Sequence, residues 1–300
     1  MKKGRAWDTG MREKRKQQKS YLYAVWKRFL EHRAGVISLV IVALIVIAAL
    51  LAPVLAKWEP NSIGGGLGMP PGNGHLLGTD EIGRDMFSRL LYGTRISLLV
   101  GILSTLISTI IGVALGLISG FFGGVVDMVI MRLTDIIMSF PYILLVLVSG
   151  QIFGPGMWNI ILILGFVDWP GMARLVRGSV LSLKEADFVN SSKISDMPIW
   201  YILFSEIFLN VIGSVLIYAT TIMSASILDE AALSFLGMGV QLPDPSLGNL
   251  LNGAESLSIL TYKPWIWVPS GIVIILLVLG VNFIGDALRD ALDPTTESGD

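Results

Sequence analysis

The chain has 300 residues and a formal net charge of −1, with 53% hydrophobic residues, 15% charged residues and a mean hydropathy of +0.70. Soluble domains usually carry about 25% charged residues, and here the charges are separated by long neutral apolar stretches. A soluble core cannot bury so many of these stretches, so the composition excludes an ordinary soluble domain and predicts a protein embedded in a lipid bilayer. The absence of cysteine excludes disulfides and thiolate metal sites.

Six segments are long and apolar enough to cross a bilayer, which requires about 20 residues for a hydrocarbon core of about 30 Å. The predicted fold class is therefore an all-α membrane protein with about six transmembrane helices. The first helix is expected over residues 34–56, which carry no charge. The other five are expected over residues 95–120, 126–149, 158–178, 207–228 and 264–285.

The basic residues predict how the chain is oriented. Residues 1–33 form a basic tail with 11 of the 22 Lys and Arg residues, so this tail is expected in the cytoplasm. Six spans then place the C-terminal tail, residues 289–300, and the loop 184–210 in the cytoplasm as well. Residues 57–94 are expected outside the cell as a separate segment. Residues 95–288 are expected to form the main transmembrane domain.

Chemical motifs of enzymes are absent from the sequence. There are only two histidines, and neither a HExxH helix nor a GxxxxGK[ST] phosphate loop occurs. No catalytic residue, metal site or cofactor is therefore predicted for this chain. The spacing of Gly112, Gly116 and Gly120 favours close packing of helices within the bundle.

Charged residues inside the predicted spans are costly and need a partner or water. Arg132 and Asp135 are three residues apart, so they share a helix face and are predicted to form a structural ion pair. Asp168 precedes Trp169-Pro170, where the proline is expected to bend the helix next to a cavity. Asp168, Asp229 and Glu230 are candidates for pathway or gating residues, although the last two could simply reach the headgroups.

The cytoplasmic loop 184–210 is too long for a plain connection, which usually has about 4–6 residues. A break near residues 195–198 followed by Trp200, Tyr201 and Phe204 predicts two short helices that meet at a turn. Amphipathic helices without a core of their own favour docking by another subunit.

Three blocks of the sequence resemble the oligopeptide/dipeptide permease C group, the inner-membrane subunits of peptide-type ABC importers. They are residues 75–98 with the GTD and GRD elements, the loop 184–210, and residues 230–241 with 285–294. The resemblance implies a type I ABC importer permease fold in the cytoplasmic membrane. It also implies as partners a second homologous permease, two ATPase subunits that bind ATP and Mg, an extracytoplasmic binding protein, a peptide substrate and lipid, without nucleic acid.

The resemblance also implies roles for individual residues. In the family's coupling loop, Asn190 stands at a glutamate position, Ser191 and Ser192 at alanine positions and Asp196 at a glycine position. Asp196 argues against a required glycine-only backbone conformation, although aspartate tolerates the left-handed conformation better than most residues. The segment around the GTD and GRD elements is expected to fold as an interfacial helix and loop, either as a structural plug or as a binding-protein contact. The predicted ATPase contacts are Asp187, Phe188, Asn190, Ser191, Ser192, Lys193, Asp196, Met197 and Pro198, and the outer signature is Gly78, Thr79, Asp80, Gly83, Arg84 and Asp85.

The function that the resemblance implies is ATP-driven import of oligopeptides, in which this chain forms half of the pathway and has no ATPase site of its own. Dipeptides, nickel chelates or glutathione are alternative cargoes for the same architecture. A carrier or channel that works without an ATPase is the alternative from a different class.

Overall fold

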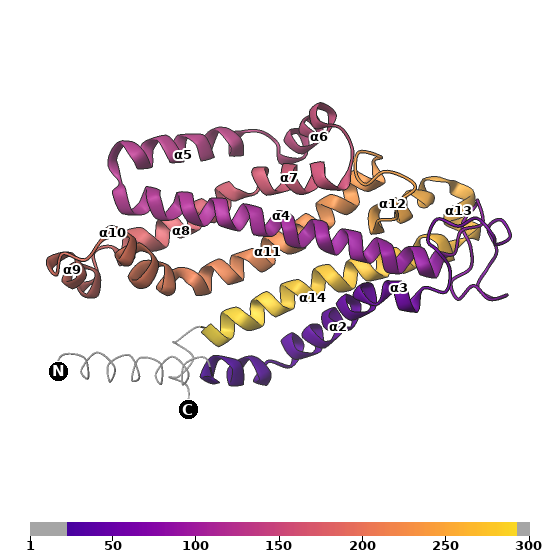
Figure 1. The fold of residues 1–300 in the computed structure, drawn as a ribbon, viewed down its shortest axis with the longest axis horizontal. Coiled ribbons are helices and arrows are strands. Elements are labelled where there is room, and N and C mark those ends of the chain that lie inside the picture. Colours follow the sequence, from indigo (N-terminus) through magenta and orange to yellow (C-terminus); the bar gives the residue numbers. More distant parts are fainter. Residues whose placement is uncertain (1–22, 293–300) are drawn as a thin grey trace.

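The computed structural model describes residues 23–292, and all regular elements in this part are helices (Figure 1). The predicted tails, residues 1–33 and 289–300, therefore lie largely outside the described residues. Residues 23–31 are helical and precede the first labelled helix. The long elements are α2 (Arg33–Leu50), α4 (Met86–Phe122), α5 (Gly124–Ser139), α6 (Tyr142–Phe153), α7 (Met157–Val167), α8 (Trp169–Leu183), α11 (Phe208–Phe235) and α14 (Val268–Leu292).

Short helical elements connect the long helices at both ends of the bundle. At one end the connection is made by α9, α10 and a π-helical segment, and at the other end by α3, α12, α13 and two 3₁₀ turns. Their bounds are α3 Ala52–Leu55, α9 Asp187–Ile194, α10 Ile199–Tyr201, π segment Ile202–Ile207, α12 Leu247–Leu251, α13 Leu257–Tyr262, and 3₁₀ turns Asn252–Glu255 and Pro264–Ile266.

Five helical runs are long and apolar enough to cross a bilayer, and the pair α5 and α6 makes a sixth if it is counted as one span. The prediction of about six membrane helices is confirmed with this count. The continuous runs are Arg33–Leu50, Met86–Phe122, Met157–Leu183, Ile199–Phe235 and Val268–Leu292.

The third predicted span, residues 126–149, is not one straight helix. The axes of α5 and α6 meet at 90°. Pro141 lies at the corner, where its ring removes a backbone donor and disfavours a helical conformation of the preceding residue. Phe140 is accordingly extended, with φ −83° and ψ 142°. Pro170 has a weaker effect, because the helix is interrupted at Asp168 but α7 and α8 continue as one span.

Glycines hold α4 directly against α8. A methyl group on Gly112 would lie 2.5 Å from the Met172 Cβ, and one on Gly116 would lie 2.7 Å from the Ala173 carbonyl oxygen. The same applies to Gly120, where a methyl group would lie 2.7 Å from the Val180 Cβ. The predicted packing role of this glycine series is therefore confirmed.

The two ends of the bundle carry different segments, as Figure 1 shows. The start of α2, the end of α14 and the connection α9–α10 lie at one end, and α3, α12 and α13 lie at the other. Residues 57–85 belong to this second end and contain turns and isolated bridges but no helix. The expected interfacial helix in this segment is therefore wrong. Its glycines explain the difference, because several of them have positive φ angles, including Gly78 at 71° and Gly83 at 87°.

Candidate functional site

The connection between α8 and α11 forms the predicted pair of short helices. Helix α9 ends at Ile194, and the chain reverses through Asp196 before α10 begins at Ile199. Asp196 has a φ of 52°, which is the left-handed conformation. The amide of Met197 closes the turn by donating to the Ser192 carbonyl at 3.1 Å. The turn therefore does not require glycine, because aspartate tolerates the left-handed conformation better than most residues and adopts it here at the end of a helix.

The connection presents an apolar surface to the outside of the bundle. The exposed fraction is 86% for Ile194, 68% for Trp200 and 54% for Phe204, and the rings of Trp200 and Phe204 stack with centroids 6.2 Å apart. Phe188 and Met197, two of the predicted ATPase contacts, belong to the same exposed set at 39% and 41%. Large apolar groups in such a position indicate a protein-binding surface.

Only one side chain of α9 is fully buried, and it fixes the connection to the bundle. Val189 has no exposed surface and packs in a core cluster with Ile202, Leu203 and Ile207 of the π-helical segment. That segment leads without a break into α11. Helix α9 is therefore packed directly against the start of a membrane helix.

Polar residues of the connection bond mainly within it. The side-chain amide of Asn190 donates to the Glu185 carbonyl at 3.0 Å, the Ser191 hydroxyl to the Asp187 carbonyl at 2.7 Å, and the Lys193 ammonium to the Lys184 carbonyl at 2.9 Å. These bonds fix the shape of the loop, and the apolar side chains remain free for a partner. Asp187 begins α9, Ser192 accepts the bond that closes the turn, and Pro198 precedes α10.

Two of the predicted pathway residues lie around one tyrosine in the bundle. The Tyr142 hydroxyl donates to the Asp229 carboxylate at 2.8 Å. Tyr142 and Asp168 line the same hollow of about 230 Å³, to which Tyr218 also contributes. One carboxylate oxygen of Asp168 is buried and has no hydrogen-bond partner among the described residues. Tyr142 was not among the predicted residues, because only the folded chain brings it across to Asp229.

Glu230 has a different environment from its neighbour Asp229. Its side chain has no exposed surface, and its carboxylate accepts hydrogen bonds from the hydroxyls of Ser97 at 2.5 Å and Ser234 at 2.7 Å. The two hydroxyls in turn accept backbone bonds from Leu247 at 3.1 Å and Val240 at 3.0 Å. Glu230 thus joins α4, α11 and the outer connection, and it does not line the hollow around Tyr142.

Ion pairs attach α5 to α8. Asp135 lies 2.5 Å from an Arg174 nitrogen but 4.0 Å from Arg132, whose side chain is 78% exposed. The predicted partner Arg132 is therefore the more distant of the two. A second pair joins Asp127 to Arg177 through two hydrogen bonds of 2.5 and 2.6 Å. Both contacts with α8 were missed, since the pairing residues are far apart in the sequence.

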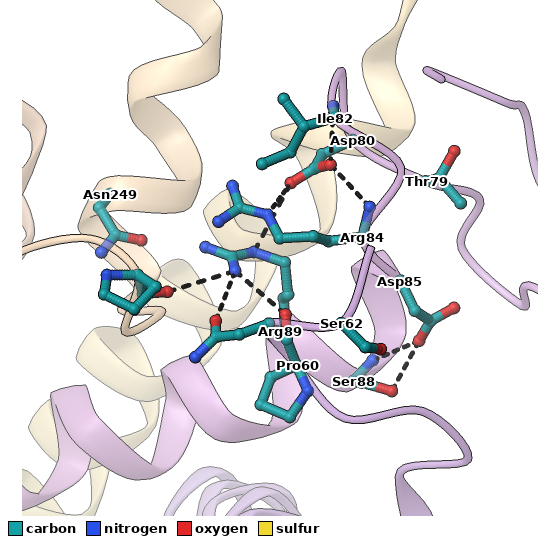
Figure 2. A network of polar contacts seen from close by, with 12 residues as sticks. Pro60, Ser62, Thr79, Asp80, Ile82, Arg84, Asp85, Ser88, Arg89 and Asn249 are labelled. Carbon is teal, nitrogen blue, oxygen red and sulfur yellow. Dashed lines mark hydrogen bonds and ion pairs between the residues drawn. The ribbon is translucent and has the colours of Figure 1, made fainter. Parts of the chain in front are cut away.

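The outer signature folds into a polar network at the start of α4 (Figure 2). The Asp80 carboxylate accepts bonds from the Arg84 side-chain Nε at 2.6 Å and from the amides of Ile82 and Arg84. Asp85 caps α4 by accepting from the Ser88 amide at 2.7 Å and also contacts the His75 ring at 2.8 Å. The Thr79 hydroxyl donates to the Gly66 carbonyl at 2.5 Å, while Gly78 and Gly83 provide the tight turns.

No group of three or more histidine or acidic side chains that could hold a metal ion occurs within residues 23–292. The candidate site thus consists of an exposed apolar surface at one end, a hollow with a few polar groups inside the bundle and a polar network at the other end.

The chain is similar to known transport proteins. The model of the family "binding-protein-dependent transport system inner membrane component" matches residues 112–298, and the N-terminal transmembrane domain of oligopeptide transport permease C matches residues 20–71. The oligopeptide transport system permease protein OppC of Escherichia coli K12 is 43% identical over 89% of both chains. The dipeptide transport system permease protein DppC of Haemophilus influenzae is 38% identical over 92% of this chain and 95% of its own.

A solved structure of the MetNI methionine ABC transporter, in an inward-facing conformation, shares the fold. Its TM-score is 0.56 at 18% identity, and the match covers 69% of this chain and 98% of the other. With the permease fold, the membrane helices and the relatives in agreement, the chain belongs to the family of inner-membrane components of binding-protein-dependent transport systems.

Proposed function

We propose that the chain is a permease subunit of an ATP-driven importer of oligopeptides. It forms half of the translocation pathway and is coupled to a separate ATPase through the connection α9–α10. The observation that carries this proposal is the exposed apolar surface of Ile194, Trp200 and Phe204, which is fixed to the bundle through the buried Val189. The relatives named for oligopeptide and dipeptide transport support the cargo.

The proposed partners are those expected for this family of importers. A second homologous permease completes the pathway, two ATPase subunits bind ATP and Mg, one of them docks on α9–α10, and a binding protein delivers peptide at the opposite end. This chain binds no nucleotide or metal itself. In the proposed orientation both termini and α9–α10 lie in the cytoplasm, and residues 57–85 lie outside.

The hollow around Tyr142 is the proposed pathway element of this subunit. Asp168 and Asp229 provide carboxylates next to a tyrosine hydroxyl, and a passing peptide carries an ammonium group at its N-terminus that such groups can stabilise. Glu230 is excluded from this role in our proposal, because its carboxylate is enclosed by serine hydroxyls.

Uptake by proteoliposomes tests the proposal. The complete importer should accumulate labelled oligopeptides only when ATP is present on the side of the membrane that carries the ATPase. Omission of the ATPase should abolish uptake. Transport by this chain alone would contradict the proposal and support an independent carrier or channel. Competition by unlabelled dipeptides, a nickel chelate and glutathione identifies the cargo among the alternatives.

A pair of matched variants tests the docking surface. Ile194→Asp places a charge on the proposed ATPase contact, whereas Leu257→Asp does the same at a similarly exposed residue, 86% against 78%, at the opposite end of the bundle. We expect Ile194→Asp to reduce co-purification of the ATPase at least about tenfold, because a charge must be desolvated in an apolar interface. Leu257→Asp should leave it unchanged, and equal loss in both variants would contradict the assignment.

A further inference from the structure

A cavity of about 490 Å³, lined by both polar and apolar side chains, opens at the outer end of the bundle, between the loop that precedes α4 and the connection from α11 to α14. Its size lies in the range of about 300–1,000 Å³ that is typical of small-molecule sites. Asp80, Arg84, Arg89, Asn249, Glu81 and Glu255 are among the residues that line it.

Two arginines form the floor of this outer cavity. Arg89 is 1% exposed, and Figure 2 shows its guanidinium group beside that of Arg84, with both groups extending toward the segment that carries Asn249. The Nη1 atom of Arg89 donates to the carbonyls of Pro60 and Pro243 and to the side chain of Asn61, at 3.1–3.4 Å. These bonds hold Arg89 in place at the base of the cavity.

The charge of this floor is only partly compensated. Asp80 bonds to Arg84 at 2.6 Å and lies 3.9 Å from the Arg89 Nε. The Asp244 carboxylate also attracts Arg89, but no hydrogen bond or ion pair joins it to either arginine within the described residues. Within residues 23–292 the buried Arg89 Nε has no hydrogen-bond partner. Nor does any described residue accept a bond from the terminal nitrogens of Arg84. A buried charge without a full counter-charge is costly, and planar guanidinium groups match a carboxylate.

The rim of the cavity has the opposite charge. Glu81 and Glu255 line the cavity and are exposed, whereas Arg89 and Asp80 are buried. Glu81 is paired with Lys263 at 3.2 Å, and Glu255 has no charged partner among the described residues. An acidic rim repels ligands that carry only negative charge, such as a free phosphate or an acidic loop. A zwitterion is complementary to both parts of the cavity, because its carboxylate can pair with the arginines of the floor and its ammonium group with the acidic rim.

We propose that the outer cavity is a receiving site for short peptides. The free C-terminal carboxylate binds Arg84 and Arg89, and the N-terminal ammonium group lies near Glu255. This inference rests on the proposed peptide cargo, and it adds a second peptide contact on this subunit at the end opposite the ATPase surface.

Binding of trialanine to the permease–ATPase complex in nanodiscs, without the binding protein, tests the inference by calorimetry. We expect trialanine to bind at least about tenfold more tightly than trialanine amide, because the amide lacks the charge that pairs with the two arginines. N-acetyl-trialanine should also bind more weakly, because it cannot pair with Glu255. Equal affinity for trialanine and its amide, or no binding of trialanine, would overturn the inference.

Variants assign the effect to the floor of the cavity. Arg84→Gln should weaken trialanine binding about tenfold and remove the preference over the amide, while Arg84→Lys should restore part of both. Arg132→Gln is the matched control, since Arg132 is an exposed arginine of α5, and it should bind like the wild type. Wild-type affinity in the Arg84→Gln variant contradicts the site.

Two further results distinguish a peptide site in this cavity from a contact for the binding protein and from a failure of the proposed function. If trialanine does not bind the wild-type complex and Arg84→Gln weakens only the attachment of the binding protein, the two arginines bind a carboxylate of that protein. The peptide site is then refuted. If the wild-type importer takes up peptide but Arg84→Gln has no effect on trialanine binding, only the cavity assignment fails. An importer that takes up no peptide contradicts the proposed function itself.

Discussion

Asp196 shows how one backbone angle shapes the docking surface. Its left-handed conformation, φ 52°, reverses the chain between α9 and α10. Non-glycine residues pay a steric penalty of about 1–2 kcal/mol in this region, and aspartate is among those that tolerate it best. The residue type at this position therefore decides whether the exposed apolar side chains on both sides of the turn keep their relative positions.

Substitution of Asp196 should separate backbone shape from charge. Asp196→Gly should preserve ATP-driven peptide uptake, because glycine adopts the same angle without strain. Asp196→Val should reduce uptake several-fold, because a β-branched residue is a true outlier at positive φ. Uptake assays in proteoliposomes with equal amounts of reconstituted complex provide the measurement. Equal loss of uptake in the glycine and valine variants would show that the carboxylate, not the turn, matters.

Glu230 is the second residue whose environment leads to a prediction. Glu230→Ala leaves the hydroxyls of Ser97 and Ser234 without their acceptor and creates a void, so we expect a loss of about 2–4 kcal/mol in unfolding free energy. Glu230→Gln keeps a carbonyl oxygen as acceptor and should lose less than half of this amount. Thermal unfolding of the purified protein in detergent measures both, and equal losses would contradict the hydrogen-bonding role.

At the scale of the elements, the sequence predicted what depends on local composition. Apolar length located the spans, and the spacing of Gly112, Gly116 and Gly120 predicted a close helix contact, although the partner α8 became known only from the fold. The position of Pro141 marked a break, but the 90° angle between α5 and α6 depends on tertiary contacts. The pair of Asp127 with Arg177 is one such contact, and it joins residues 50 positions apart.

Two glycines of the same helix pair offer a matched test of this packing. Gly116→Ala puts a methyl group 2.7 Å from the Ala173 carbonyl oxygen, so we expect a destabilisation of about 1–3 kcal/mol from overpacking. At Gly178 of α8 no heavy atom lies within 4 Å of the added methyl group. Gly178→Ala should therefore be neutral or stabilise by up to about 1 kcal/mol through helix propensity. Melting temperatures in detergent provide the measurement, and we expect Gly116→Ala to melt below the wild type and below Gly178→Ala.

At the scale of the whole molecule, the division into two functional ends was predictable, and the contacts inside each end were not. The loop 184–210 and the GTD and GRD elements could be located from the sequence. The role of Arg89 could not, because its partners Pro60, Asn61 and Pro243 come from two distant loops. The contact of Tyr142 with Asp229 could not be predicted for the same reason, because the two residues are 87 positions apart in the sequence.

The absence of native cysteine makes the orientation of the molecule directly testable. Ile194→Cys and Leu67→Cys each place a single thiol at a well exposed residue, 86% and 73% exposed, at opposite ends. In the proposed orientation, a membrane-impermeant maleimide should label Leu67→Cys in right-side-out vesicles and Ile194→Cys only in inverted vesicles that lack the ATPase. The reverse labelling pattern would show the opposite orientation.

The π-helical segment Ile202–Ile207 between α10 and α11 has a mechanical consequence. A π turn contains about one residue more than an α turn, so the helices on its two sides are out of phase. Conversion of this segment into a regular α-helix would shift the register by one residue and turn α11 by about 100° around its own axis. Both helices would remain intact. In the proposed importer, an ATPase that displaces α9 would act on this segment, and a change of its register would alter which face of α11 is turned toward the pathway.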